Sequence, residues 1–219
     1  MMILHYFLEL ASLFFGCVLV QKSWPAPYRL LVVFKCVEFS IAVLSMLWSS
    51  LMRQSNHWIY NLYNPVECIF LLYIFYRAAM HGVIKRLNLI LLATVLPLIL
   101  AGYVLSPNFF SLNIIGSAGC FLLLLLSSCG AYVDLLLDKG DLPLFRHPLF
   151  WLAGGVLMYG ICMVLYYITW EYSKKMILYR FFFIDYFGGL CLLNLGIIGC
   201  FVFVYRQWAQ IARSGTFEQ

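Results

Sequence analysis

The sequence predicts an all-α, polytopic membrane protein folded as a single bundle of seven transmembrane helices. Of its 219 residues, 64% are hydrophobic and only 11% are charged, and the mean hydropathy is +0.93. An average soluble domain is about 25% charged, and a soluble fold of this size could not hide so much apolar surface. The apolar stretches also recur at about the 20 residues that one membrane crossing needs.

Short polar or proline-bearing breaks divide the chain into these stretches. The first stretch has no basic residues before it and no small-residue cleavage site after it, so we expect a retained helix rather than a signal peptide. QKSWPAPYR ends it, and RQSN, HGVIKR, SPNFFS, DKGDLPLFRHP and EYSKK separate the later ones with typical loop residues. The predicted helices of this single domain, residues 1–219, run roughly over 2–20, 29–51, 57–80, 87–105, 112–137, 149–171 and 177–205.

Basic residues predict the direction of insertion. One side of the bundle receives nine of them: Lys22, Arg29, Arg77, Lys85, Arg86, Lys139, Arg146, Arg206 and Arg213. The other side receives four: Arg53, Lys174, Lys175 and Arg180. Because basic loops favour the cytoplasm, we expect an external N-terminus and a cytoplasmic C-terminus. Basic residues scattered in this way are topology signals, and we expect no nucleic-acid partner.

Small and polar residues recur at helical spacing, so each helix can turn one polar stripe inward. The stripes are His5, Glu9, Ser12 and Gly16 in the first helix, Lys35, Glu38, Ala42, Ser45 and Ser49 in the second, Gly116, Cys120, Ser127, Gly130 and Asp134 in the fifth, and Asp185, Gly188, Gly196 and Gly199 in the seventh. Packing between membrane helices explains the small members. Asp134 lies near a helix end, where we expect solvation to explain it.

The central acids need a further explanation. An ionised carboxylate at the bilayer centre costs at least about 2.5–3.5 kcal/mol, yet Glu9, Glu38 and Glu67 all lie near helix midpoints. Lys35 precedes Glu38 by one turn and can pair with it, pair with another acid, or extend to the interface. The set therefore predicts either a structural ion-pair network or a polar chamber that binds a solute, an ion or a proton.

The third predicted helix has the densest polar set. Asn61, Asn64 and Glu67 lie within one apolar stretch, and Pro65 removes an amide hydrogen and so frees the carbonyl of Asn61. A freed carbonyl in lipid must find a partner. A kinked structural helix and a ligand or ion site both fit this pattern. The candidate binding residues are Glu9, Lys35, Glu38, Asn61, Asn64, Glu67 and Asp185.

The sequence argues against several chemistries. The last helix has no lysine between Asp185 and Tyr205 for a retinal Schiff base, and the four histidines form neither HxxxH nor HExxH. No paired-glutamate motif is present, and the eight cysteines form no CxxC pair. We expect no catalytic residues, no metal site and no cofactor, and therefore not an enzyme.

The segment NHWIYNLYNPVE…FYR, together with FWLAGGVLMYG in the sixth helix, resembles a family of short bacterial seven-helix integral membrane proteins. This resemblance covers the second, third and sixth helices. It implies a location in the bacterial inner (cytoplasmic) membrane and implies no activity, substrate or cofactor.

Three functions remain open from the sequence. The first is a membrane sensor or accessory module that binds a small ligand, lipid or ion in its chamber and signals through a partner protein. The second is a small ion- or proton-coupled transporter or oligomeric channel, which three unbalanced acids favour, although no inverted repeat is evident. The third is a membrane-acting effector of a bacterial defence or toxicity system. The expected partners are membrane lipids and a second protein or further copies of the chain.

Overall fold

The fold is entirely helical in the part of the chain that the structure describes. The computed structural model describes residues 2–21, 24–53, 55–105, 112–138, 143–173 and 179–213, and it describes side chains in these ranges except those of residues 2, 170–185 and 211–213. Within them are the α-helices α1 (Met2–Leu19), α2 (Ala26–Met52), α3 (His57–Ala78), α4 (Gly82–Leu105), α5 (Ile114–Leu137), α6 (Pro148–Ser173) and α7 (Tyr179–Arg213), with a short 3-10 helix at Leu144–Arg146. The seven predicted helices therefore all exist.

Among the described residues, five helices are long and apolar enough to cross a membrane. They are Ala26–Met52, Gly82–Leu105, Ile114–Leu137, Pro148–Thr169 and Tyr186–Gln210. In α1 the apolar part is shorter, Ile3–Leu19, and α3 is made less apolar by Asn61, Asn64 and Glu67. The large hydrophobic side chains that the five helices expose are mainly Leu, Ile, Val and Met, which indicates a membrane protein.

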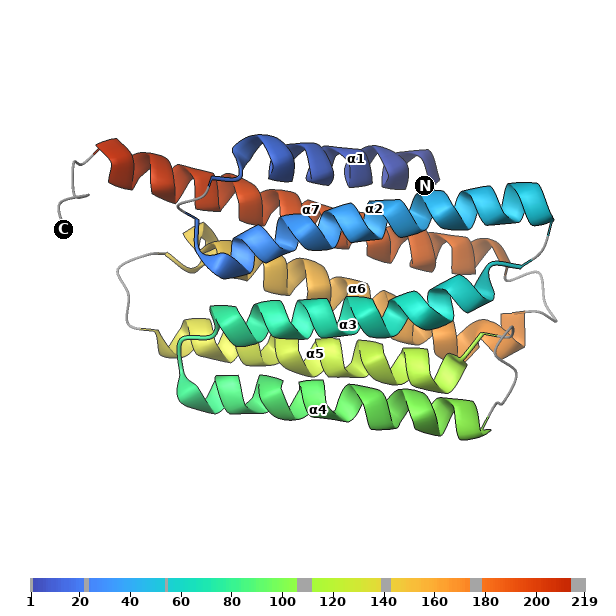
Figure 1. The fold of residues 1–219 in the computed structure, drawn as a ribbon. Helices are drawn as coiled ribbons and strands as arrows, with labels where there is room; N and C mark the ends of the chain where they lie inside the picture. The colour runs from blue at the N-terminus through green and yellow to red at the C-terminus, as the bar shows by residue number, and fades with distance from the viewer. Residues whose placement is uncertain are drawn as a thin grey trace.

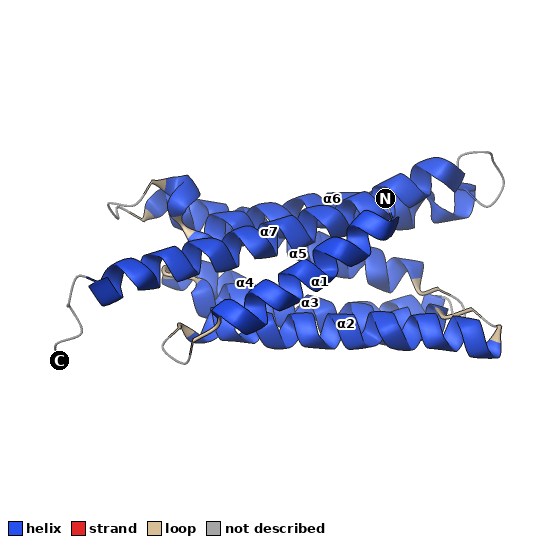
Figure 2. Ribbon diagram, turned by 90° about the horizontal axis from the view of Figure 1, so that it is seen from above, coloured by secondary structure: helices blue, strands red, loops and turns tan. Residues whose placement is uncertain are grey.

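The helices form an elongated bundle with neighbouring helices side by side (Figure 1). The closest pairings are α6 with α7 and α5 with α6, while α3 packs on α2, α4 and α5. Seen from above, α1 runs diagonally across the bundle, and it contacts α7 and α2 (Figure 2). Since α2 and α7 touch each other only slightly, α1 provides most of the packing between these two helices by contacting both.

Glycine allows the closest helix contact. The backbones of α6 and α7 meet at Gly155 and Gly196, where a Cβ atom on Gly196 would lie 2.6 Å from the Cα atom of Gly155. No other residue type fits this approach without moving one of the helices. The predicted packing role of Gly196 is thus confirmed, and the contact brings the backbones of α6 and α7 directly against each other.

The polar stripes face inward as expected. His5, Glu9 and Ser12 of α1 are buried, as are Lys35, Glu38 and Ser45 of α2 and Ser127 and Asp134 of α5. Pro65 does not interrupt α3, which is helical from His57 to Ala78. The bundle core beneath these stripes is apolar and continuous, and includes Leu31, Phe34, Leu71, Phe121, Leu152 and Phe201.

Candidate functional site

A cavity lies between the α2–α3 and α6–α7 pairs, with α1 beside it. Its lining residues come from five helices: His5, Glu9, Glu38, Ile41, Ala42, Tyr60, Tyr63, Asn64, Glu67, Tyr159, Met163, Tyr186 and Leu190. The cavity has an empty volume of about 430 Å³, including the part that is open to the surroundings. The first halves of α1 and α3, the middles of α2 and α6 and the first part of α7 contribute these residues, so the cavity lies off the centre of the bundle, toward the end where α1, α3 and α7 begin.

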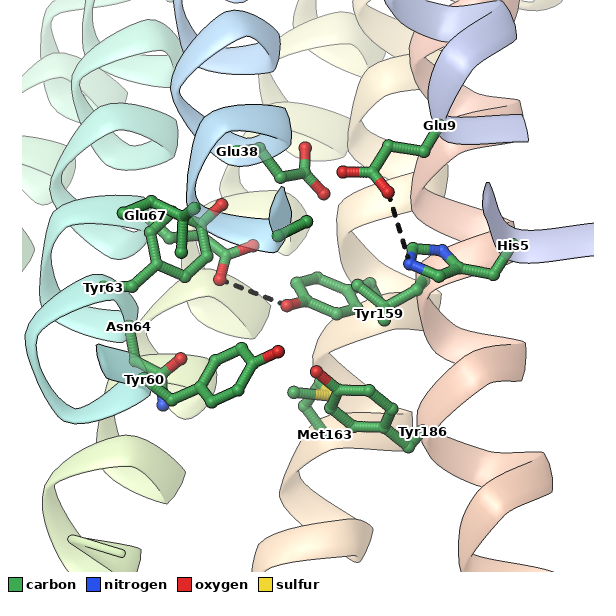
Figure 3. A pocket seen from close by; sticks show the side chains of 13 residues that line it. His5, Glu9, Glu38, Tyr60, Tyr63, Asn64, Glu67, Tyr159, Met163 and Tyr186 are labelled. Carbon is green, nitrogen blue, oxygen red and sulfur yellow. Dashed lines mark hydrogen bonds and ion pairs between the residues drawn. The ribbon is translucent and has the colours of Figure 1, made fainter. Parts of the chain in front are cut away.

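Glu9, Glu38 and Glu67 converge on this cavity. Their helices are α1, α2 and α3, and Figure 3 shows the carboxylates of Glu9 and Glu38 turned toward each other. Glu9 and Glu67 are each only 1% exposed. Charged groups buried this deeply are unfavourable unless they are paired or hydrogen-bonded, and so the partners of each carboxylate decide what the site can do.

Glu38 has a full ionic partner. Its Oε2 atom accepts a hydrogen bond from the ammonium of Lys35, one turn earlier on α2. Lys35 is fully buried and also donates to Oδ1 of Asn194, 2.7 Å away on α7. The alternative in which Lys35 extends to the membrane interface is therefore wrong, because these two partners hold it inside the bundle.

Asn194 joins three helices beside the cavity. Its Oδ1 atom accepts from Lys35 of α2 and from the hydroxyl of Ser12 of α1, which is 2.7 Å away. Its amide nitrogen donates to the carbonyl oxygen of Leu190 at 2.9 Å. Sequence reasoning missed Asn194, although an amide in the apolar run LCLLNLGII is the same kind of signal that singled out Asn61 and Asn64.

Glu67 and Glu9 are only partly satisfied. Oε2 of Glu67 accepts from the hydroxyl of Tyr159 at 3.1 Å, and Oε2 of Glu9 lies 3.5 Å from Nε2 of His5 (Figure 3). Four polar atoms here have no hydrogen-bond partner among the described residues: Oε1 of Glu67, Oε2 of Glu9, Nδ1 of His5 and the hydroxyl of Tyr63. These atoms belong to residues that line the cavity and are buried beside it.

The two predicted amides have different roles. Asn64 lines the cavity, and its amide nitrogen donates to the hydroxyls of Ser117 at 2.9 Å and Tyr167 at 2.7 Å. Asn61 is not a lining residue; its Oδ1 atom accepts from the backbone N–H of Asn113 at 2.8 Å, which ties α3 to the start of α5. Asp185 belongs to α7, but its side chain lies outside the described residues.

Tyrosines complete the lining, and the sequence pattern did not assign them to it. Tyr60 and Tyr63 come from α3, Tyr159 from α6 and Tyr186 from α7. Figure 3 shows the rings of Tyr60, Tyr159 and Tyr186 beside the open space. Tyrosine is frequent in both cores and membrane interfaces, so only the fold could select these four from the chain's fifteen.

Asp134, near the far end of α5, has a different role from the one expected. It is fully buried, so solvation does not explain it. The backbone N–H groups of Met80 and His81 donate to its two carboxylate oxygens at 2.7 and 2.9 Å, and Nδ1 of His81 lies 2.7 Å from Oδ1. Asp134 therefore fastens the loop between α3 and α4 to α5.

Comparison with models of known protein families, with curated proteins and with solved structures finds no match to this chain. The resemblance noted in the sequence thus stays a prediction. Within the described residues, no group of three or more His, Cys, Asp or Glu side chains is placed to hold a metal ion. The site is accordingly defined by its own geometry: a tyrosine-rich cavity with buried carboxylates.

Proposed function

We propose that the chain is a seven-span integral membrane sensor or accessory module of the bacterial inner membrane, which binds a small ligand in this cavity and signals through a protein partner. The observation that carries the proposal is the unpaired Oε1 atom of Glu67 beside open space. A buried carboxylate oxygen that lacks a hydrogen-bond donor destabilises the folded protein. A ligand that supplies the missing donor recovers it.

The arrangement of helices supports coupling between binding and a change of shape. The lining residues belong to α1, α2, α3, α6 and α7, and α2 and α7 contact each other only slightly. A ligand that bonds at once to α2 or α3 on one side of the cavity and to α6 or α7 on the other would favour one arrangement of these helices over another. A partner protein, or another copy of the chain, would detect that change.

The exposed basic residues support an orientation with the N-terminus outside. At the end where α1 and α3 finish, the described exposed basic residues are Arg29, Arg77, Lys85, Arg86, Arg146 and Arg206. At the cavity end, the described one is Arg53. Since basic ends favour the cytoplasm, the cavity would occupy the outer half of the membrane. Fluorescence of a C-terminal green fluorescent protein fusion tests this, because that fusion folds only on the cytoplasmic side.

The binding function is tested by thermal unfolding of the purified chain in lipid nanodiscs against cationic, anionic and neutral small solutes. At least one class of solute is expected to raise the unfolding midpoint of the wild type. Glu67→Gln and Asn64→Ala should reduce that rise. If no class of solute changes the midpoint and both variants behave as the wild type, the ligand-binding function is wrong.

A coupled transporter is the second candidate, favoured by the facing carboxylates of Glu9 and Glu38 (Figure 3). Groups of this type carry protons or cations in membrane transporters. Flux measured in proteoliposomes separates the two candidates. A transporter requires flux that disappears when Glu9, Glu38 and Glu67 are changed together to Gln, whereas the sensor shows binding without flux.

A further inference from the structure

Two carboxylate oxygens beside the cavity have no hydrogen-bond donor among the described residues. Oε1 of Glu67 and Oε2 of Glu9 have no hydrogen-bond partner among the described residues, and neither has the hydroxyl of Tyr63. All three residues line the cavity and are more than nine-tenths buried. Ionised carboxylate oxygens only accept hydrogen bonds, so a ligand for Glu67 and Glu9 must supply a donor. A charged donor bonds a carboxylate more strongly than a neutral one does.

The charges around the cavity also favour a cation. The charged groups that the described helices bring there are the carboxylates of Glu9, Glu38 and Glu67 and the ammonium of Lys35, with the titratable His5 3.5 Å from Glu9. Lys35 is engaged by Glu38 and Asn194, which leaves Glu9 and Glu67 without a full ionic partner. A bound cation would offset this excess of negative charge.

The remaining lining distinguishes an organic cation from a metal ion. The rings of Tyr60, Tyr63, Tyr159 and Tyr186 border the cavity together with Met163, and aromatic faces attract ammonium groups. Among the described residues, no group of three or more His, Cys, Asp or Glu side chains is placed to hold a metal ion. A ligand with several N–H donors and a short apolar part can bond to the separate carboxylates of Glu9 and Glu67 and also pack against the tyrosine rings, which a spherical ion cannot do.

We propose that the cavity binds a small primary ammonium group, which donates to Oε1 of Glu67 and to the carboxylate of Glu9 while the tyrosine rings surround its alkyl part. This proposal rests on the ligand-binding function above and specifies its ligand. The ammonium can belong to a free amine or to the ethanolamine headgroup of a lipid, since both present the same –NH₃⁺ group.

The test compares four solutes on the full chain in phosphatidylcholine nanodiscs. n-Butylammonium chloride is expected to raise the thermal unfolding midpoint in a saturable manner. 1-Butanol lacks the charge, tetramethylammonium chloride lacks N–H donors, and sodium chloride matches the ionic strength, so these three should produce no saturable rise. Replacing phosphatidylcholine by phosphatidylethanolamine distinguishes the sources: a headgroup ligand raises the midpoint without added amine, and a free amine does not.

Variants locate the effect. Glu67→Gln removes one charged acceptor and should weaken the apparent affinity for butylammonium by about tenfold or more. Glu9→Gln removes the other charged acceptor and should also weaken that affinity, and so it provides a second variant if Glu67→Gln fails to fold. Asp138→Asn is the matched control, because Asp138 is an exposed carboxylate at the end of α5; it should leave the affinity unchanged.

Two results would overturn the ammonium ligand. One is equal stabilisation by butylammonium and 1-butanol, or by sodium chloride alone; the proposed binding function then stands with another class of ligand. The other is a butylammonium affinity that Asp138→Asn reduces as much as Glu67→Gln does, since binding would then not involve the cavity. No response to any solute, in either lipid, ends both the ammonium ligand and the binding function.

Discussion

The bundle buries carboxylates in two regions, near the end of α5 and beside the cavity, and their hydrogen bonding differs between the two. Near the end of α5, Asp134 accepts from two backbone N–H groups and contacts the imidazole of His81. In the cavity half, Glu67 and Glu9 each retain a carboxylate oxygen without a hydrogen-bond partner among the described residues. All three side chains are almost completely buried, so burial does not separate them. Hydrogen-bond satisfaction does: Asp134 is a structural group, and the cavity acids are candidates for binding.

Glu38 stands between these two cases, because it lines the cavity but has its own cation. This pairing is the strongest interaction in the comparison. Lys35→Met leaves Glu38 as an uncompensated buried charge and is expected to lower the free energy of unfolding by about 3–5 kcal/mol. Chemical denaturation in mixed micelles measures it. The double variant Lys35→Met with Glu38→Gln should recover most of that loss, and a double variant as unstable as the single one would show that the ion pair is not the cause.

Asp134, near the end of α5, gives the next largest effect. Asp134→Ala removes the acceptor of the Met80 and His81 backbone N–H groups and the partner of the His81 imidazole, at an expected cost of about 2–4 kcal/mol in unfolding free energy. His81→Ala keeps both backbone hydrogen bonds and should cost about 1 kcal/mol. Equal losses for the two variants would place the stabilisation in the imidazole contact, contrary to a role for Asp134 in holding the loop.

The α6–α7 wall of the cavity is tested by its closest contact. Gly196→Ala places a methyl group against Gly155 and the carbonyl oxygen of Trp151 and should cost about 1–3 kcal/mol through overpacking. Gly82→Ala is the control, because a Cβ atom on Gly82 would meet no atom within 4 Å outside its chain neighbours and its own helix backbone. Its unfolding free energy should stay within about 0.5 kcal/mol of the wild type. If both glycines tolerate alanine, the two helices are not a rigid wall.

The smallest stability effect is the one that separates the two regions most sharply. Glu67→Gln keeps an acceptor for Tyr159 and removes a buried charge, so the unfolding free energy should stay within about 1 kcal/mol of the wild type. Asp134→Asn removes one of two satisfied acceptors and should lower stability by about 1–3 kcal/mol. Parallel thermal melts compare them. Should Glu67→Gln be the more damaging, Glu67 would be a structural group.

The helices were predictable from the sequence because apolar length and polar breaks depend only on neighbouring residues. The inward direction of Glu9, Lys35 and Glu38 was also predictable, since helical spacing places them on one face. Their partners were not. Asn194 lies 159 positions after Lys35 along the chain, and no local pattern shows which helices become neighbours.

The same limit explains the corrected roles. Asn61 belongs to the same polar stretch as Asn64 and Glu67, but it points toward the start of α5 and pairs with the backbone of Asn113. Asp134 was placed near the interface by its position in the helix, whereas the loop between α3 and α4 folds over it and removes it from solvent. Position along a helix gives depth, but the covering by distant segments is a property of the tertiary fold.

The central claim is that the cavity beside Glu67 is a binding space rather than a packing defect. A high-resolution experimental map of the full chain in lipid nanodiscs tests it most directly. We predict ordered non-protein density within hydrogen-bond distance of Oε1 of Glu67 and the hydroxyl of Tyr63. A map in which the Tyr63 hydroxyl donates to Glu67, with side chains closing the space and no density in it, would contradict the claim.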